Sequence, residues 1–335
     1  MADACPKSTF APLLQAFFVE RLIQQRAVSP QTIASYRDTF RLFLEFVQHH
    51  TGKAPTDVAL TDINAPLVLA FLCHLEVDRN NSVRTRNARL AALRSFLKYA
   101  AHKDISAIAI IQSTLAIPMK RFDKKLVGFL SREEIQSILD APDVRTWCGQ
   151  RDRVLFSTLY NTGARVSEII GLRVRDIVLS QSSFVHILGK GRKERTVPLW
   201  RTTAMQIKHW LPHIGASPDQ RLFPNRSGQP MTRSNVTDRL QLAVQSAAMQ
   251  CPMLLQHRVS PHVIRHSTAQ HLLHAGVDLN VIALWLGHES PATTHMYMQA
   301  DLTMKEQALN TLQPPKTKAM RYRPPDRLLQ FLESM

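Results

Sequence analysis

Residues 162–168 read Thr-Gly-Ala-Arg-Val-Ser-Glu, a turn followed by the start of a helix. Gly163 permits the turn, and we expect Arg165 to open a helix whose apolar residues face inward. An arginine at a helix start lies beside free backbone N–H groups, and together they form a favourable place for an anion. For this segment alone, a surface ion pair between Arg165 and Glu168 is the better explanation. Whether Arg165 binds an anion therefore depends on which other residues of the chain lie near it.

A β-hairpin is predicted shortly after this turn. Two β-prone segments, Ser183–Leu188 and Arg195–Leu199, flank a basic tip that reads Gly-Lys-Gly-Arg-Lys-Glu at residues 189–194. Lys190 on such a hairpin can reach into a groove and give a proton to a leaving oxygen. A plain phosphate contact explains the lysine as well. The same contact explains the other basic residues of the hairpin: Arg192, Lys193 and Arg195.

Residues 260–266 read Ser-Pro-His-Val-Ile-Arg-His. A Ser-Pro pair is typical of a helix start, so His262 and Arg265 are expected to share a face of the helix. The arginine charge lowers the proton affinity of a neighbouring histidine and keeps it near neutrality for acid–base work. An isolated histidine of this kind is more often structural, and His266 more often still.

Residues 286–288 read Leu-Gly-His and precede a Ser-Pro pair and Tyr297. Gly287 ends a helix predicted over residues 279–286, and His288 follows in the turn, where its ring nitrogens can face a ligand. Tyr297 by itself is typical of a half-buried packing tyrosine.

Together these four segments describe a site for a phosphodiester. Two guanidinium groups and His288 can bind the non-bridging oxygens and the charge that develops on them. The phenolic oxygen of Tyr297 can attack phosphorus and conserve the ester bond covalently. The leaving 5′ oxygen has a high proton affinity and needs a general acid, for which Lys190 is the candidate. Carboxylates are few and do not cluster, so we expect no metal and no cofactor.

Charge and composition favour a polyanionic partner. The 335 residues carry a formal net charge of +16, and neutralising phosphates releases condensed counterions. Only 11 residues are glycine, which favours helices over tight-turned β-sandwiches. No apolar run approaches the ~20 residues of a membrane-spanning helix, and no signal peptide is recognisable. We therefore expect a soluble, cytoplasmic, nucleoid-associated protein with no membrane partner.

A basic helix is predicted over residues 82–100. Between residues 79 and 98 lie six basic residues and no acid, while Leu90, Leu93 and Leu97 form an apolar stripe on another side of the helix. A solvated helix face explains any one of the basic residues equally well, but their number favours contact with nucleic acid. The candidates for DNA contact are Arg84, Arg86, Arg89, Arg94 and Lys98.

The pattern divides the chain into four parts. Residues 8–105 predict a helical DNA-binding domain, most economically a four-helix bundle. The hydrophobic pattern of residues 106–127 has no helical period, which predicts a basic linker. Residues 128–312 hold the four segments described above and predict the catalytic domain, and residues 313–335 predict a proline-rich tail.

Local signals define where several helices begin. Ser29 and Pro30 precede a helix over residues 32–48, and Thr61 and Asp62 are capping candidates for a helix over residues 65–75. Order resumes after the linker at Ser-Arg-Glu-Glu, where a capping box is expected between Ser131 and Glu134.

The chain resembles the tyrosine recombinase (phage integrase) family, most closely its Xer-like branch. Order and spacing both agree with the family: Arg265 and His288 are 23 positions apart, and His288 and Tyr297 nine. The N-terminal bundle is similar to the core-binding, SAM-like domain of the family. The resemblance implies a mainly α fold with a small β-sheet, in which the bundle and the catalytic domain form a C-shaped clamp on duplex DNA. The matching segments are residues 162–168, 189–195, 262–266 and 286–288, with Tyr297.

The resemblance also implies a role for each site residue. Tyr297 would form a 3′-phosphotyrosyl link and release a 5′-hydroxyl, with His262 assisting its proton transfer. Lys190 would protonate the leaving oxygen. The scissile phosphate would be held by three side chains and a supporting carboxylate: Arg165, Arg265 and His288, with Glu168 beside Arg165.

The partners implied are double-stranded DNA and further copies of the chain. A tetramer on DNA would exchange strands through a Holliday junction, and the resemblance leaves open a paired recombinase or a DNA-bending accessory protein. Four apolar residues of the tail would dock on a neighbouring protomer: Leu328, Leu329, Phe331 and Leu332.

Two local features favour an integrase or transposase of a mobile element over an Xer-type dimer resolvase. Residues 295–299 read His-Met-Tyr-Met-Gln rather than the threonine-flanked form usual in the family, and the tail is long and basic. A type IB topoisomerase would share the nucleophile and pocket but act as a monomer. A catalytically silent DNA-binding factor is the alternative from a different class.

Overall fold

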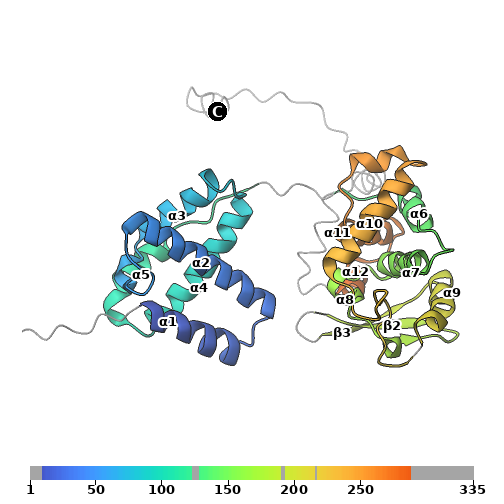
Figure 1. Ribbon diagram of the computed structural model, residues 1–335, viewed down its shortest axis with the longest axis horizontal. Helices are drawn as coiled ribbons and strands as arrows, with labels where there is room; N and C mark the ends of the chain where they lie inside the picture. The colour runs from blue at the N-terminus through green and yellow to red at the C-terminus, as the bar shows by residue number, and fades with distance from the viewer. Residues whose placement is uncertain (1–9, 123–127, 190–192, 216, 288–335) are drawn as a thin grey trace, which may run out of the picture. The chain divides into compact units, whose positions relative to one another are not determined.

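The computed structural model describes residues 10–122, 128–189, 193–215 and 217–287. The chain divides into two compact units, Met1–Lys125 and Leu126–Met335, and each has its own apolar core (Figure 1). Several predicted functional residues lie outside the described residues: Lys190, Arg192, His288, Tyr297, Leu328, Leu329, Phe331 and Leu332.

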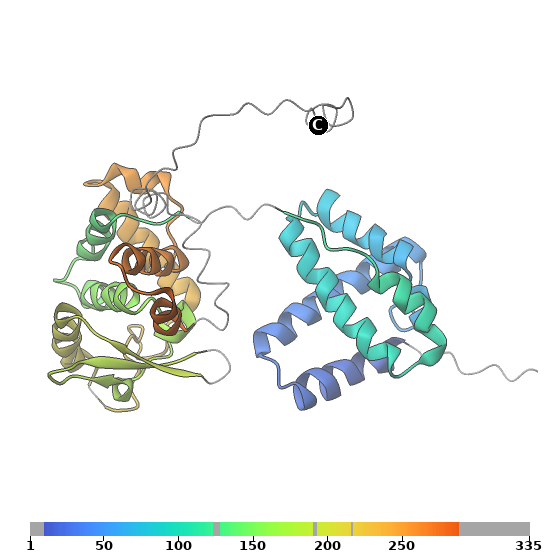
Figure 2. The ribbon, with the colours of Figure 1, turned by 180° about the vertical axis from the view of Figure 1, so that it is seen from behind.

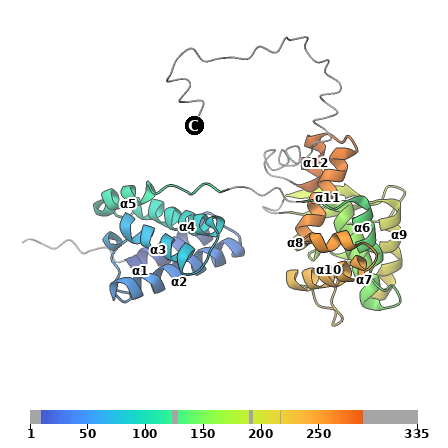
Figure 3. The same ribbon diagram turned by 90° about the horizontal axis from the view of Figure 1, so that it is seen from above.

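The N-terminal unit is built from helices. Within it α2, α3 and α4 pack against one another (Figure 3). Its elements are α1 (Phe10–Ala16), which continues as a π-helix (Phe17–Gln25), α2 (Pro30–Thr51), a 3-10 turn (Leu60–Asp62), α3 (Ala65–Val77), α4 (Val83–Ala101), a second 3-10 turn (Ile105–Ala107) and α5 (Ile108–Leu115).

Helix starts in this unit follow the capping rules, with one correction. The Ser29 hydroxyl accepts a hydrogen bond from the backbone N–H of Thr32 at the start of α2, as predicted. For α3 the predicted caps Thr61 and Asp62 are wrong, because both belong to the 3-10 turn before it. The cap is Asn64, whose side chain accepts from the N–H of Leu67 at 3.0 Å.

The prediction of a linker over residues 106–127 is wrong for its first half. Residues 108–115 form α5, so the unit contains a helix beyond the four predicted. Ile111 of α5 is buried in the same core as Ala107 and Ile117. A helix of eight residues spans about two turns, too few for an apolar period to stand out in the sequence.

Phenylalanine rings fill the centre of the N-terminal unit. The ring of Phe96 on α4 lies 5.1 Å from that of Phe10, 5.6 Å from that of Phe17 and 5.4 Å from that of Phe40, measured between centroids. All three pairs meet edge to face, the arrangement that aromatic quadrupoles favour. These contacts join the first helical segment, α2 and α4 into one core.

The second unit combines helices with a small sheet at one end (Figures 1 and 2). Here α7 packs against both α9 and α11. Its elements are α6 (Arg132–Asp140), α7 (Trp147–Thr162), α8 (Val166–Ile169), β1 (Ile177–Val178), β2 (Phe184–Leu188), β3 (Glu194–Pro198), α9 (Arg201–Trp210), α10 (Arg233–Ala248), α11 (Pro261–His274) and α12 (Leu279–Leu286), with 3-10 turns at Val174–Asp176, Leu211–Ile214 and Pro252–Gln256.

The predicted hairpin is confirmed and is part of a three-stranded antiparallel sheet in the order β1-β2-β3. The two-residue strand β1 is not predicted, because so short a strand has no alternation of its own. Val185 of β2 lies opposite Val197 of β3, and both are buried. Ile187 lies opposite Arg195, so the arginine occupies the inward face of its strand.

Three helix boundaries of the second unit agree with the sequence signals described above. The Ser131–Glu134 capping box is present, with the serine hydroxyl accepting from the glutamate N–H at 3.1 Å and the carboxylate accepting from the serine N–H at 2.7 Å. Ser260 caps α11, and Gly287 ends α12 with a φ of +66°.

None of the described helices combines the length and the apolar character needed to cross a membrane.

Replacing Phe96 by alanine tests the core of the N-terminal unit. Removing a buried ring that contacts three others is expected to lower the free energy of unfolding by about 3–5 kcal/mol. Urea denaturation followed by far-UV circular dichroism measures the loss. All four tryptophans lie in the second unit, so their fluorescence serves as an internal control. A loss no larger than that of Phe122→Ala, at an exposed site, contradicts the assignment.

Candidate active site

The turn at residues 162–168 connects α7 to α8. Gly163 ends α7 with a φ of +57°, a conformation that residues with a Cβ rarely adopt. A Cβ added at this position would meet the side chain of Leu286 on α12. Glycine is therefore needed twice here, for the backbone turn and for the close approach of a helix more than 100 residues away in sequence.

Arg165 and Glu168 form the ion pair that the sequence analysis considered. One carboxylate oxygen of Glu168 accepts from the backbone N–H of Arg165 at 2.9 Å, and the other accepts from its Nη1 at 2.8 Å. The Glu168 side chain is only 4% exposed, whereas that of Arg165 is 39% exposed. The pair is thus buried on its acidic side and open on its basic side. Arg165 also donates through Nη2 to the backbone carbonyl of Gly287 at 3.4 Å.

Arg195 points into the protein rather than toward a ligand. Its Nη2 donates to Glu168 at 2.7 Å and its Nε donates to the carbonyl of Trp285 at 2.9 Å. The side chain is nearly buried. These contacts argue against the predicted DNA contact for Arg195, which instead joins the hairpin to α8 and α12. The alternation of β3 could have indicated this, since Arg195 precedes the buried Val197 by two positions.

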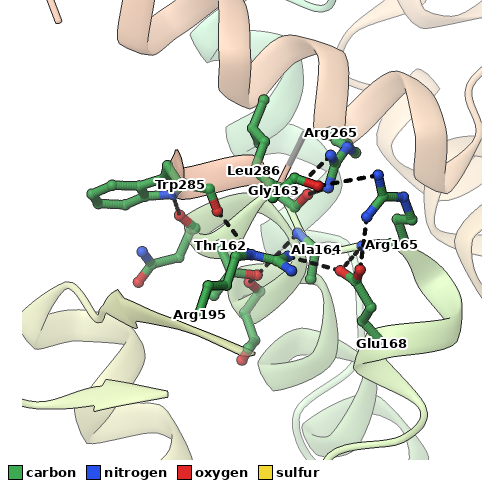
Figure 4. Close-up of polar contacts among 12 residues, drawn as sticks. Thr162, Gly163, Ala164, Arg165, Glu168, Arg195, Arg265, Trp285 and Leu286 are labelled. Carbon is green, nitrogen blue, oxygen red and sulfur yellow. Dashed lines mark hydrogen bonds and ion pairs between the residues drawn. The ribbon is translucent and has the colours of Figure 1, made fainter. Parts of the chain in front are cut away.

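Arg265 reaches the same place from α11. It is 2% exposed and donates from Nη1 to the carbonyl of Gly163 at 2.5 Å and from Nη2 to the carbonyl of Leu286 at 2.8 Å. The guanidinium therefore joins the end of α7 to the end of α12, as the close-up in Figure 4 shows.

The C-terminal end of α12 is the common point of the site. Its last carbonyls have no partners within the helix and carry the negative end of the helix dipole, which attracts cations. The carbonyl of Trp285 accepts from Arg195 and that of Leu286 accepts from Arg265 (Figure 4). The carbonyl of Gly287, the residue after the helix, accepts from Arg165.

Three guanidinium groups consequently lie around residues 285–287, directly before His288 in the sequence. Of these three side chains that of Arg165 is partly exposed, so its guanidinium group is suited to binding a phosphate beside the buried charges of Arg195 and Arg265. Gly287 itself has little room, because a Cβ there would lie 2.9 Å from Nη1 of Arg195.

His262 and His266 form a pair on α11. Their Nε2 atoms are 2.9 Å apart, with His262 exposed and His266 buried. Burial, with smaller contributions from His262 and Arg265, lowers the pKa of His266 to about 4, so this ring is neutral at pH 7. The sequence predicts that Arg265 acts on His262 and that His266 is structural; in the structure Arg265 also lowers the pKa of His266. The i, i+4 spacing of the two histidines was the signal that could have linked them.

The hairpin approaches the carboxylate of this site. The backbone N–H of Gly189 donates to the carbonyl of Lys193 at 2.8 Å, and a Cβ at Gly189 would lie 3.5 Å from Glu168. The residue that precedes Lys190 in the chain therefore lies against Glu168, while Lys193 is exposed. Among the described residues, no three His, Cys, Asp or Glu side chains are placed to hold a metal ion.

The basic candidates on α4 differ in exposure. Arg84 and Lys98 are exposed, and Arg89 and Arg94 are half-buried. Arg86 is only 4% exposed and donates to the carbonyl of Pro118 at 3.2 Å. This burial argues against the predicted DNA contact for Arg86, whose side chain holds the segment after α5 against α4.

Replacing Glu168 by glutamine tests the carboxylate that joins two of the arginines. Burial raises the pKa of Glu168, but the hydrogen bonds and charges of Arg195 and Arg165 outweigh it, so the pKa is lower than usual. Stability from such a group is present above the pKa of the unfolded chain and is lost as pH falls through the folded pKa.

We expect Glu168→Gln to lower the free energy of unfolding by about 2–3 kcal/mol at pH 7, and the difference to shrink below about pH 4. Urea denaturation at both pH values measures it, with the exposed Glu45→Gln as control. A difference that stays constant with pH contradicts the assignment.

Two family models match this chain. The phage integrase family matches residues 128–304, and the N-terminal SAM-like domain of phage integrases matches residues 16–104. The protein y4rC of Sinorhizobium fredii, named an integrase/recombinase, is 44% identical over 328 residues, which cover 98% of this chain and 99% of y4rC. The tyrosine recombinase XerD of Pseudomonas putida is 31% identical over 291 residues, covering 85% of this chain and 92% of XerD.

A solved structure supports the fold. The XerH site-specific recombinase, bound to its palindromic difH substrate, superposes with a TM-score of 0.69 at 23% identity, covering 85% of this chain and 81% of XerH. A family match to more than half of the chain shows its family. The chain belongs to the phage integrase family of tyrosine recombinases, enzymes that cleave and rejoin DNA.

Proposed function

We propose that this recombinase integrates or excises a mobile DNA element, and that Tyr297 is the nucleophile that forms the 3′-phosphotyrosyl intermediate. The observation that carries the role is the extent of the match to y4rC. That match covers 98% of this chain, whereas the match to XerD covers 85%. The match to a protein named an integrase/recombinase therefore extends over more of this chain than the match to XerD does. Resolution of chromosome or plasmid dimers is the alternative, favoured by the 31% identity to XerD.

In the proposed reaction Arg165, Arg265 and His288 bind the non-bridging oxygens of the scissile phosphate. The partial exposure of Arg165 beside the carbonyl of Gly287 supports this. Arg265 is 2% exposed and donates to the carbonyl of Leu286, so its nearby positive charge is what supports its role. Their charge stabilises the negative charge that develops as the phosphate becomes five-coordinate. Glu168 holds Arg165 by two hydrogen bonds and is the supporting carboxylate.

Two proton transfers accompany strand cleavage in this proposal. The phenolic oxygen of Tyr297 bonds to phosphorus as the bond from phosphorus to the 5′ oxygen breaks. The phenolic proton passes to His262, and Lys190 gives a proton to the leaving oxygen. The position of Gly189 against Glu168 supports a role for the hairpin at this site.

DNA contact outside the site is proposed for the exposed face of α4. Arg84 and Lys98 lie on this face, with the half-buried Arg94 beside it. Ala88 and Ala91 between them are exposed and small, which allows a helix to approach a groove closely. Lys193 and Arg192 of the hairpin are further candidates. Assembly as a tetramer, with the apolar tail docked on a neighbouring copy, is part of the same proposal.

Tyr297→Phe tests the nucleophile. We expect the variant to bind DNA as tightly as the wild type and to form no covalent adduct, because only the attacking oxygen is removed. Labelled duplexes tiled across the DNA that flanks the gene are incubated with the protein, and adducts are counted after denaturing electrophoresis. Adducts formed by the variant would show that another residue attacks.

The double variant Arg94→Glu with Lys98→Glu tests the basic helix. Loss of phosphate contacts is expected to weaken DNA binding and to reduce the slope of log K against log salt by about 2. Binding is measured on the same duplexes by fluorescence anisotropy. Arg21→Glu with Arg145→Glu makes an equal change of charge at exposed sites on other helices and loops. Equal losses for the two double variants would contradict a specific role of α4.

A further inference from the structure

The histidine pair of α11 has an asymmetry that the reaction can use. His262 and His266 lie one turn apart on the helix, their Nε2 atoms are 2.9 Å apart, and their ring planes are inclined at 80°. His262 is exposed and His266 is 5% exposed. One ring therefore faces the surface and the other faces the interior, with a hydrogen bond between them.

This hydrogen bond determines which nitrogen of each ring can carry a proton. One of the two Nε2 atoms must donate and the other must accept. If His262 is to take a proton as a base, its Nε2 must be the donor, since only then does its Nδ1 carry the lone pair. His266 must accordingly be the neutral tautomer that accepts at Nε2. Its buried position favours a neutral ring, and its low pKa keeps it neutral at pH 7.

The same bond survives the proton transfer. When Nδ1 of His262 gains a proton, the Nε2–H of the imidazolium still donates to the lone pair of His266. A positively charged His266 would have no lone pair to offer and would repel the imidazolium. A neutral, buried His266 can therefore hold the ring of His262 both before and after His262 gains the proton. In catalytic triads a third group orients the general base in the same way.

We propose that His266 is a positioning residue for strand cleavage: by accepting a hydrogen bond from Nε2 of His262, it holds His262 in the tautomer whose Nδ1 takes the phenolic proton of Tyr297. The inference rests on the proposed role of His262 and adds the residue that makes this role possible. His266 itself transfers no proton. In the step it supports, the phenolic oxygen bonds to phosphorus, the bond to the 5′ oxygen breaks, and the proton goes to His262.

Three substitutions at residue 266 separate this role from packing. Glutamine places a polar atom near the position of Nε2, asparagine places one near Nδ1, and methionine places none. We expect His266→Met and His266→Asn to slow single-turnover cleavage about 10- to 100-fold. His266→Gln should restore the rate to within about threefold of the wild type, with DNA affinity unchanged in all three.

Gln270→Met provides a matched control on the same helix. Gln270 is buried and contacts His274 at i+4 through an Nε2–Nε2 distance of 3.1 Å, which repeats the chemistry of the pair away from the site. Its loss is expected to lower stability without changing the cleavage rate. Cleavage is measured on labelled duplexes from the flanking DNA, and stability by urea denaturation of the full chain.

A double-mutant cycle with His262→Ala decides whether His266 acts through His262. Once His262 is absent, His266→Met should cause no further loss of rate. The inference is overturned if His266→Met cleaves as fast as wild type, if glutamine is as slow as asparagine, or if the loss persists in the His262→Ala background. If His262→Ala itself cleaves at the wild-type rate, the proposed role of His262 fails and the inference fails with it.

Discussion

Three successive carbonyls at the C-terminal end of α12, those of residues 285–287, accept hydrogen bonds from arginines of three separate parts of the chain. A helix C-terminus is a site of negative potential, and cations satisfy both its dipole and its unpaired carbonyls. The folded second unit therefore positions its guanidinium groups on backbone atoms rather than on flexible side chains. Glu168 completes the arrangement by forming ion pairs with two of the arginines, Arg165 and Arg195.

Local signals in the sequence define much of this structure. Ser260 and Gly287 set the start of α11 and the end of α12, and the positive φ of Gly163 turns the chain between α7 and α8. The capping box at Ser131 and the hairpin strands depend likewise on neighbours within a few residues. Such interactions are visible in sequence because both partners are close together along the chain.

Long-range packing explains what the sequence analysis missed. Arg86 and Arg195 are basic residues in basic segments. The alternation of β3 indicates the inward face of Arg195, but nothing nearby in sequence indicates that the carbonyls of Pro118 and Trp285 are the partners of the two arginines. The pairing of His262 with His266 is local, but the burial that distinguishes them comes from the surrounding unit. Position along a helix thus indicates which residues can meet, whereas charge alone does not indicate whether a side chain faces solvent.

The contact between the ends of α7 and α12 limits how the enzyme can diverge. Both Gly163 and Gly287 have a positive φ that other residues rarely adopt. A Cβ at Gly163 would meet the side chain of Leu286, and a Cβ at Gly287 would meet the guanidinium group of Arg195, so a side chain at either position would disturb this contact region. The exposed surface of α4 has no comparable restriction. Substitutions on the exposed surface of α4 can therefore leave the ends of α7 and α12 intact, and a library of variants of this chain should leave both glycines unchanged.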